Sequence, residues 1–434
     1  MITFEQLQSK QEAICVVGLG YVGLPLAVLL SEHFHVLGFD IDTKKIAELE
    51  KGYDRTGEVT KERLEKSSLT YSADPQTIAQ AKFIIIAVPT PVDSHNIPNL
   101  SIVKSATRLV AEHMQKGSIV VYESTVYPGV TEDMCLPIIE EVSGLSLHTE
   151  FGIAYSPERV NPGDKKHTID KITKVISGSN EAVFVVLEEV YGSITNTFRA
   201  VSIKAAEAAK VIENTQRDVN IALMNELAMI FHKMDLSIYD VLEAANTKWN
   251  FLPFTPGLVG GHCIGVDPYY LTYKAQELGH TPEVMLSGRG INDAMHVFMA
   301  NDILKKALQL GKDIASLQVA FYGMTFKENV PDIRNSKVVS LYKELCSFGM
   351  KPFVYDPYVD KDELMHEYGI PLVSDRDDIP VVDILIVAVA HRDFAIYCID
   401  ELMYLTKEHA LIVDIKHLYN KEEIEKSGRS YWSL

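Results

Sequence analysis

The sequence predicts an α/β protein in which two doubly wound parallel sheets are joined by a central helical region. Residues 13–125 alternate short apolar runs with segments of helical length, and this alternation returns from residue 317. Residues 199–234, between them, are rich in Ala, Leu, Met and Glu and contain neither Gly nor Pro. Apolar strands separated by helices are typical of parallel sheets covered on both faces. We therefore expect domains at 1–198, 199–311 and 312–434.

Each expected element follows from its local pattern. Apolar runs that end in polar or glycine residues predict strands at 13–20, 35–42, 82–91, 117–125, 317–326, 351–359, 381–390 and 409–416. Helical periodicity predicts one long helix at 199–234 as the spine of the central domain, with further helices at 238–247, 268–279, 290–310 and 336–350.

The composition narrows the class of protein. The 434 residues are 47% apolar, and the formal net charge is −18. Nucleic acids and anionic membranes bind basic patches, so we expect neither as a partner. The most apolar runs, at 83–88 and 384–390, are too short to cross a bilayer. Five scattered cysteines without a Cys-x-x-Cys pair predict no disulfide framework and no metal site, as in a reducing cytoplasm.

A dinucleotide-binding loop is predicted near the N-terminus. Gly18, Gly20 and Gly23 form a Gly-x-Gly-x-x-Gly pattern between a strand and a helix, the context that a Rossmann-like site requires. Asp40 ends the next strand, where an acid accepts hydrogen bonds from a ribose and disfavours a 2′-phosphate. The expected cofactor is NAD, although Lys45 nearby neutralises part of the repulsion of a 2′-phosphate.

Polar residues at other strand ends are weaker candidates. Thr90 and Thr125 follow two strands of the first sheet and are either hydroxyl donors near the nicotinamide or polar turn residues. The second α/β unit lacks the glycine pattern but carries Lys327 and Arg334 after its first strand. These two cations indicate a different phosphate ligand, or a solvated basic pair.

The stretch "TPGLVGGHCIGVDP" at 255–268 places Cys263 in a glycine-rich loop. Glycine clusters mark places where backbone approaches another group closely, although a lone cysteine is more often inert. A thiolate can attack an aldehyde to give a thiohemiacetal, which is oxidised to a thioester and opened by water.

Four further residues suit that chemistry. Lys210 and Asn214 lie four apart on the predicted long helix and share a face, so they can stabilise an alkoxide and donate to an oxyanion. Asp267 can hold a water or orient Lys210, and Glu158 in "YSPERVNPG" can act as a general base.

These motifs together resemble the nucleotide-sugar 6-dehydrogenases, the family that contains UDP-glucose dehydrogenase. The resemblance covers essentially the whole chain and rests on the glycine fingerprint together with PTP at 89–91, STV at 124–126, SPER at 156–159, GGHCIGVDPYYL at 260–271, GRGIND at 288–293 and FKENVPDIR at 326–334. It implies oxidation of the C6 hydroxymethyl of a UDP-sugar to a carboxylate with two NAD, and a homodimer or higher homo-oligomer formed through the central helices.

The resemblance also implies roles for particular residues. The catalytic set is Cys263, Lys210, Asn214, Asp267, Glu158 and Thr125. The NAD-binding set is Gly18, Gly20, Tyr21, Val22, Gly23, Asp40, Lys45, Pro89, Thr90, Thr125 and Arg334. The substrate-binding set is Glu158, Arg159, Val160, Lys210, Asn214, Phe254, Gly257, Gly260, Phe326 and Lys327. Some relatives carry an arginine before the loop, where this chain has Trp249 and Asn250; Lys248 or Arg289 is a candidate substitute.

The sequence around 246–279 looks most like the branch that acts on UDP-N-acetylhexosamines for surface polysaccharide precursors. UDP-N-acetylglucosamine is the first expectation, ahead of UDP-N-acetylgalactosamine, UDP-N-acetylmannosamine and UDP-glucose. Two rival interpretations remain. A two-electron hydroxyacid dehydrogenase would have no use for Cys263 or a second α/β domain, and a non-catalytic NAD-binding sensor would not need the catalytic set.

Overall fold

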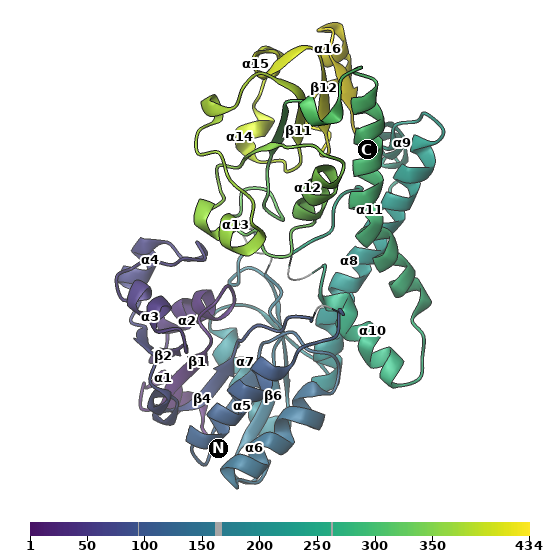
Figure 1. Cartoon of the computed structure of the whole chain (residues 1–434). Coiled ribbons are helices and arrows are strands. Elements are labelled where there is room, and N and C mark those ends of the chain that lie inside the picture. The colour runs from purple at the N-terminus through teal and green to yellow at the C-terminus, as the bar shows by residue number, and fades with distance from the viewer. Residues whose placement is uncertain (94, 161–166, 262–263) are drawn as a thin grey trace. The chain divides into compact units, whose positions relative to one another are not determined.

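The computed structural model describes residues 1–93, 95–160, 167–261 and 264–434. The chain divides into two compact units. The first consists of Met1–Glu213 and Val266–Thr281, and the second of Asn214–Gly265 and Pro282–Leu434. Figure 1 follows the chain from its N-terminal strands to its C-terminal ones. The expected α/β architecture with two sheets and a helical region is confirmed.

The first unit is built on one sheet, with eight strands in the described residues, in the order β3-β2-β1-β4-β5-β6-β7-β8. Its strands are β1 (Ala13–Val17), β2 (Val36–Phe39), β3 (Thr70–Ser72), β4 (Ala81–Ile86), β5 (Ile119–Tyr122), β6 (Gly152–Tyr155), β7 (Lys174–Gly178) and β8 (Thr197–Arg199). All neighbours pair in parallel except β6 and β7, which are antiparallel. The strand order reverses between β1 and β4, which is where doubly wound sheets bind ligands.

Helices cover both faces of this sheet. One core contains side chains from α1 (Phe4–Gln8), α2 (Gly23–Ser31), α3 (Thr43–Leu49), α4 (Lys61–Lys66) and α7 (Glu181–Gly192). The opposite core contains side chains from α5 (Ser101–His113), α6 (Leu136–Ser143), the start of α8 (Ile203–His232) and α10 (Asp267–Glu277). Within β4, Phe83 and Ile85 enter the first core, and Ile84 and Ile86 the second. The strand is apolar throughout because both of its faces are buried.

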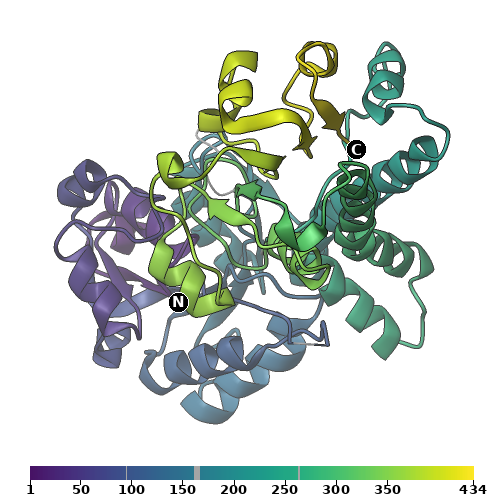
Figure 2. The ribbon, with the colours of Figure 1, turned by 45° about the horizontal axis from the view of Figure 1, so that its top comes forward.

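The second unit contains a smaller sheet, drawn in green to yellow in Figure 2. Its five described strands are all parallel and lie in the order β10-β9-β11-β12-β13. These are β9 (Val319–Tyr322), β10 (Phe353–Tyr355), β11 (Val382–Val387), β12 (Thr406–Asp414) and β13 (Ser430–Trp432). One face packs on α11 (Glu283–Leu308), α12 (Lys337–Ser347) and α13 (Lys361–Tyr368). The other packs on α14 (Arg392–Ala395), α15 (Ile399–Leu405) and α16 (Lys421–Lys426).

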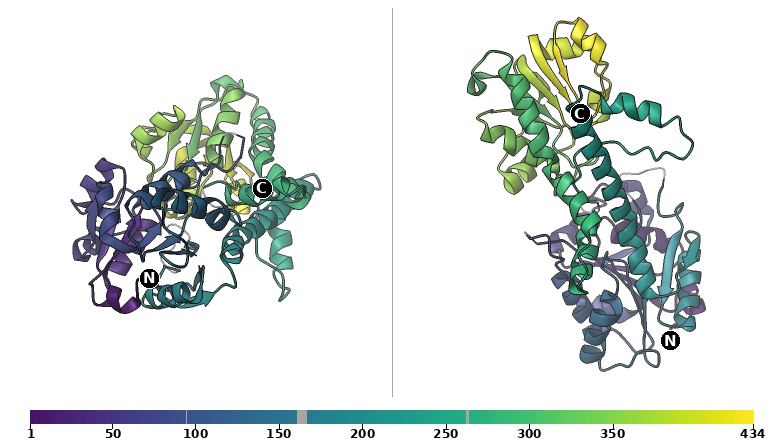
Figure 3. Two further views of the ribbon diagram at one scale, coloured as in Figure 1. Left: turned by 90° about the horizontal axis from the view of Figure 1, so that it is seen from below. Right: turned by 90° about the vertical axis from the view of Figure 1, so that its right-hand side faces the viewer.

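The helical part of the second unit comprises the C-terminal portion of α8, α9 (Ile238–Ala245) and α11. α8 and α11 lie side by side (Figure 3), and buried polar side chains join them. The prediction that a helix begins at residue 290 was wrong, because α11 begins at Glu283 and carries Gly288 and Gly290 in its interior. Gly288 faces α8, since a Cβ there would lie 3.4 Å from the Cβ of Ala222.

The predicted strands are present but shorter than the apolar runs suggested. β4 illustrates this: the predicted strand spans 82–91, but β4 ends at Ile86 and the PTP segment at 89–91 forms a loop. The predicted long helix is confirmed as α8, Ile203–His232. No helix in the described part of the chain combines the length and apolar character that a bilayer crossing requires.

Candidate functional site

The glycine loop after β1 has a conformation suited to a pyrophosphate. Gly18 has φ +97°, and a Cβ there would lie 2.7 Å from the carbonyl oxygen of Ala87. At Gly23, the first residue of α2, a Cβ would lie 1.9 Å from the Gly18 carbonyl oxygen. At Gly20 a Cβ would meet nothing within 4 Å. Gly18 and Gly23 are thus required by the packing of the chain itself. Gly20 leaves the backbone open beside a helix N-terminus, as NAD binding requires. Tyr21 and Val22 are half-buried in the same loop.

Asp40 is held at the end of β2 by three donors. Its Oδ2 accepts the backbone N–H of Leu19 at 2.9 Å and lies 2.7 Å from Nζ of Lys45. Its Oδ1 accepts the N–H of Asp42 at 2.9 Å. The carboxylate is therefore fixed next to the glycine loop, where the ribose of a dinucleotide is bound. Lys45 does lie beside this acid, as the sequence suggested.

The remaining predicted residues of the first unit follow the carboxyl ends of its strands. Thr90 and Thr125 are half-buried in the loops after β4 and β5, and Pro89 is exposed. Tyr270 of α10 donates its hydroxyl to the carbonyl of Pro91 at 3.3 Å, which joins α10 to the first of these loops. Parallel strands bring these loops to one edge of the sheet, as expected.

Lys210 and Asp267 form a buried pair within the first unit. Nζ of Lys210 on α8 lies 4.0 Å from Oδ2 of Asp267, the first residue of α10, and the side chains are 9% and 5% exposed. Asn214 follows Lys210 by one turn of α8 and is also buried. The pair puts a desolvated ammonium next to a carboxylate, an arrangement that can stabilise an alkoxide or transfer a proton.

Glu158 lies after β6 in a network that sequence analysis missed. Its Oε2 is 3.1 Å from Nζ of Lys174, and that ammonium is also 2.6 Å from Oε2 of Glu123. Arg159, predicted as a substrate contact, donates from Nε to Glu213 at 3.1 Å. The only signal for the network is a lysine at the start of a largely buried strand, β7.

In the second unit, the loop that precedes Cys263 is anchored by two asparagines. The backbone N–H of Gly257 donates to Oδ1 of Asn225 at 2.8 Å, and its carbonyl accepts from Nδ2 at 3.0 Å. Gly261 donates its N–H to the carbonyl of Asn335 and accepts from Nδ2 of the same residue at 2.9 Å. Cys263 itself lies outside the described residues.

Close packing explains two glycines of this loop. A Cβ at Gly260 would lie 2.6 Å from the Asn335 carbonyl oxygen, and one at Gly261 would lie 2.6 Å from the ring of Phe326. The segment that carries the predicted substrate residues Phe326 and Lys327 therefore packs directly against the glycine loop. Phe254, also predicted to bind substrate, is half-buried at the start of that loop.

The two predicted cation positions of this unit have different surroundings. Lys327 is half-buried, and its carbonyl accepts the hydroxyl of Thr325 at 2.8 Å. Arg334 forms two bonds with its neighbour Asp332, from Nε at 3.0 Å and from Nη2 at 2.7 Å. The candidate substitute Arg289 pairs through Nη1 with buried Asp218 at 2.6 Å.

The loop after the first strand of the second sheet resembles the dinucleotide loop in one feature, an acid that accepts a backbone N–H, but a histidine ring lies beside that acid. Gly323 has φ +91°, and Asp356 after β10 accepts the N–H of Met324 at 2.7 Å, as Asp40 accepts that of Leu19. Beside Asp356, however, stands the buried ring of His391, whose Nε2 is 3.1 Å from Oδ2 of that carboxylate. His391 Nδ1 accepts the N–H of Asn329 at 2.9 Å, so Nε2 carries the proton.

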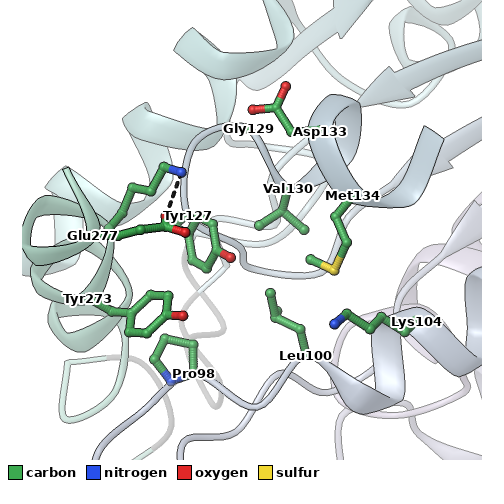
Figure 4. Close-up of a pocket in the computed structure, with 11 residues that line it drawn as sticks. Pro98, Leu100, Lys104, Tyr127, Gly129, Val130, Asp133, Met134, Tyr273 and Glu277 are labelled. Atoms are coloured by element: carbon green, nitrogen blue, oxygen red, sulfur yellow. Dashed lines mark hydrogen bonds and ion pairs between the residues drawn. The ribbon is translucent and has the colours of Figure 1, made fainter. Parts of the chain in front are cut away.

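A separate pocket of about 330 Å³ opens in the first unit (Figure 4). Tyr127 and Tyr273 face it, with ring centroids 5.7 Å apart, and Lys274 pairs with Glu277 at 2.7 Å. No predicted site residue is among the lining residues that the structure describes. The described residues also contain no cluster of His, Cys, Asp and Glu that could hold a metal ion.

Comparison with known proteins places the chain in a family. Residues 12–195 match the NAD binding domain of the UDP-glucose/GDP-mannose dehydrogenase family, residues 204–294 its central domain, and residues 320–421 its UDP binding domain. The chain belongs to the UDP-glucose/GDP-mannose dehydrogenase family. It is thus an NAD-dependent UDP-sugar dehydrogenase, and the predicted family, cofactor and enzyme class are confirmed.

Two curated relatives match almost end to end. Protein CapL of Staphylococcus aureus is 49% identical over 423 residues, covering 97% of this chain and 99% of the relative. The UDP-N-acetyl-D-glucosamine 6-dehydrogenase of Pseudomonas aeruginosa is 46% identical over 417 residues, covering 95% and 99%. Among solved structures, the UDP-D-ManNAc dehydrogenase of Pyrococcus horikoshii superposes with a TM-score of 0.88 at 29% identity, covering 97% and 99%.

Proposed function

We propose that this protein oxidises the C6 hydroxymethyl of a UDP-N-acetylhexosamine to a carboxylate, with UDP-N-acetylglucosamine as the preferred substrate. The observation that carries the proposal is 46% identity over nearly the full length to an enzyme named for this reaction on UDP-N-acetyl-D-glucosamine. Identity to the structure described as a UDP-D-ManNAc dehydrogenase is 29%. UDP-N-acetylgalactosamine is the second candidate, followed by UDP-N-acetylmannosamine and UDP-glucose.

In the first oxidation, Lys210 and Asp267 act on the substrate hydroxyl. NAD, which the loop of Gly18, Gly20 and Gly23 and the carboxylate of Asp40 would hold, would supply the hydride acceptor for each of the two oxidations. The hydroxyl gives up its proton to a water held by Asp267, and the Lys210 ammonium, 4.0 Å from that carboxylate and oriented by it, stabilises the alkoxide. Asn214, one turn along α8, donates from its amide to the same oxygen. Thr125 donates a hydroxyl hydrogen bond near the reacting carbon.

In the second oxidation, the thiolate of Cys263 is the nucleophile. Its sulfur forms a bond to the aldehyde carbon, and loss of a hydride from the resulting thiohemiacetal gives a thioester. Water then attacks the thioester carbon, the carbon–sulfur bond breaks and the thiolate is released. Glu158 orients the water and accepts its proton. Four electrons leave the substrate, two to each of two NAD molecules.

Several features support the proposed placement of the substrate. The segment with Phe326 and Lys327 packs on the glycine loop within the second unit, and residues 320–421 match a UDP binding domain. We propose that Lys327 contacts the sugar nucleotide and that Arg334 reaches the cofactor. The domain boundaries at 198 and 311, a homo-oligomer formed through the central helices, and a role in making surface polysaccharide precursors belong to the same proposal.

The substrate preference is tested by measuring kcat/KM for the purified protein on the four UDP-sugars. We expect UDP-N-acetylglucosamine to give the highest value. A higher value for one of the other three sugars would reassign the substrate but keep the reaction.

The mechanism is tested with Cys263→Ala, which is expected to bind NAD and UDP-sugar as the wild type does but to form no acid. A wild-type protein that binds both ligands without oxidising any of the four sugars would support a sensor instead. An alanine variant that still forms acid would exclude the thioester.

A further inference from the structure

Glu158 is the end point of a buried ionic network in the first unit. Nζ of Lys174 on β7 lies 2.6 Å from Oε2 of Glu123 and 3.1 Å from Oε2 of Glu158. Tyr191 of α7 donates its hydroxyl to Oε1 of Glu123 at 2.5 Å, and its ring lies 5.4 Å from the same ammonium. The side chains of Lys174 and Glu123 are 2% and 0% exposed. One ammonium therefore bridges two carboxylates out of contact with solvent.

Each oxygen of Glu158 has a defined partner. Oε1 accepts the backbone N–H of Arg159 at 2.7 Å and that of Val160 at 2.6 Å. Oε2 faces Lys174. A carboxylate held by two backbone N–H groups and one ammonium is fixed in position and favoured in its charged form. Lys210 on α8 adds a further favourable charge interaction.

The pKa values of Glu123 and Glu158 are shifted in opposite directions. Burial raises the pKa of Glu123 above its ordinary value, in spite of Lys174. Burial also acts to raise the pKa of Glu158, but the charge of Lys174 and the N–H of Val160 outweigh it and hold that pKa below its ordinary value. The ammonium contacts both carboxylates, 2.6 Å from Glu123 and 3.1 Å from Glu158, so Glu123 holds it beside Glu158.

Donors thus hold both oxygens of Glu158, and the one ammonium among them is itself held in place by Glu123. We propose that Lys174, anchored by Glu123, is a positioning residue that keeps Glu158 ionised and oriented for the hydrolysis of the thioester. This proposal rests on the proposed function. In the step concerned, water forms a bond to the thioester carbon, the sulfur leaves as thiolate, and Glu158 receives the proton from water.

Loss of the Lys174 charge should affect the hydrolysis step and not the hydride transfers. Lys174→Met should leave both hydride transfers of a single turnover nearly unchanged and slow thioester hydrolysis by about tenfold or more. The acyl group should then accumulate on the enzyme and be visible as added mass on the intact protein. The acidic limb of the pH–rate profile should move up by about one pH unit or more, since the charge that favours ionised Glu158 is gone. Lys174→Arg, which keeps the charge, should largely restore the profile.

A second variant shifts the profile in the opposite direction. Glu123→Gln keeps a side-chain oxygen that can accept from Lys174 but removes the negative charge that competes for the ammonium, so the acidic limb should move to lower pH. Lys82→Met is the control, because Lys82 also forms an ion pair in this unit, with Glu12 at 2.5 Å, away from Glu158. That variant should leave the profile in place.

The outcomes are distinguishable. The inference is overturned if folded Lys174→Met shows the wild-type profile and no adduct, or if Glu123→Gln shifts the profile upward or not at all. Should Lys174→Met fail to fold, Glu123→Gln decides alone. Failure of the proposed function looks different, because the wild-type protein would then yield no acid and the Glu158→Gln variant would trap no acyl group.

Discussion

Nζ of Lys210 and Oδ2 of Asp267 lie 4.0 Å apart in the first unit, although 57 positions separate them in the sequence. The pair joins the N-terminal third of α8 to the first residue of α10. Both side chains are largely buried, at 9% and 5% exposed. The glycine loop that contains Cys263 lies between them in the sequence.

This pair predicts the effect of removing one charge. Asp267→Asn should lower kcat about 100-fold with a small change in KM, because the ammonium loses its orienting partner without losing its contact to substrate. The measurement is steady-state NADH formation. Asp133→Asn is the matched control, since Asp133 also pairs with a lysine of α8, Lys204, at 3.1 Å, but in an exposed position. An equal loss in both variants would contradict the assignment.

The glycines of the dinucleotide loop predict two distinct defects. Gly20→Ala places a methyl group in open space, so the variant should fold with wild-type stability and bind NAD at least about tenfold more weakly. Gly23→Ala places one 1.9 Å from the Gly18 carbonyl oxygen and should destabilise the protein by about 1–3 kcal/mol. Thermal melts and NAD titration separate these effects. Unaltered NAD affinity in Gly20→Ala would argue against the loop as the cofactor site.

Glu207 predicts a pH dependence of stability. Its buried carboxylate accepts the N–H of Thr131 at 2.9 Å and that of Gly129, yet burial raises its pKa from 4.5 to about 7. The folded state therefore holds the proton more tightly than the unfolded state does. The stability contributed by this group is complete below pH 4.5 and is lost as the pH rises through about 7.

The variant Glu207→Gln removes this dependence. Relative to the variant, the wild type should lose up to about 3 kcal/mol of unfolding free energy between pH 4.5 and 7. Urea unfolding of both proteins across that interval measures the difference. A difference that stays constant with pH would contradict the raised pKa.

Asn225 predicts a coupled loss of stability and activity. It is fully buried, and its amide holds both polar backbone groups of Gly257 while donating to Asn292 at 2.8 Å. Asn225→Ala leaves these groups without their partner and should cost about 2 kcal/mol. It should also lower kcat, since Gly257 begins the loop that contains Cys263. Asn220→Ala on the exposed face of the same helix should change neither urea midpoint nor kcat.

The two-sheet fold, the dinucleotide loop and the long helix could be predicted from the sequence because each depends on a local pattern. A short stretch of sequence is enough to predict the glycine loop and the acid after the next strand. The same is true of the long helix, which contains neither Gly nor Pro. The start of α11 was predicted at 290 rather than 283, and glycine is unfavourable in a helix interior, whereas Gly288 here allows close approach to α8. Strand ends were overestimated because apolar loop residues continue the apolar runs.

The supporting networks could not be predicted, since their partners are distant in the sequence. Lys174 meets Glu123 across 51 positions, and Asn225 meets Gly257 across 32. Nothing near Lys174 marks it as the partner of a carboxylate. Likewise, nothing in the sequence predicts that His391 lies beside Asp356. The corresponding acid of the first sheet, Asp40, lies beside an open glycine loop instead. Only tertiary pairing reveals these contacts.

The most direct measurement is the number of NADH molecules formed per molecule of UDP-N-acetylglucosamine consumed, with the sugar limiting and NAD in excess. Two NADH per sugar, together with a uronic acid product, is the predicted result. One NADH per sugar with an aldehyde product would contradict the thioester mechanism and leave a simple alcohol dehydrogenase.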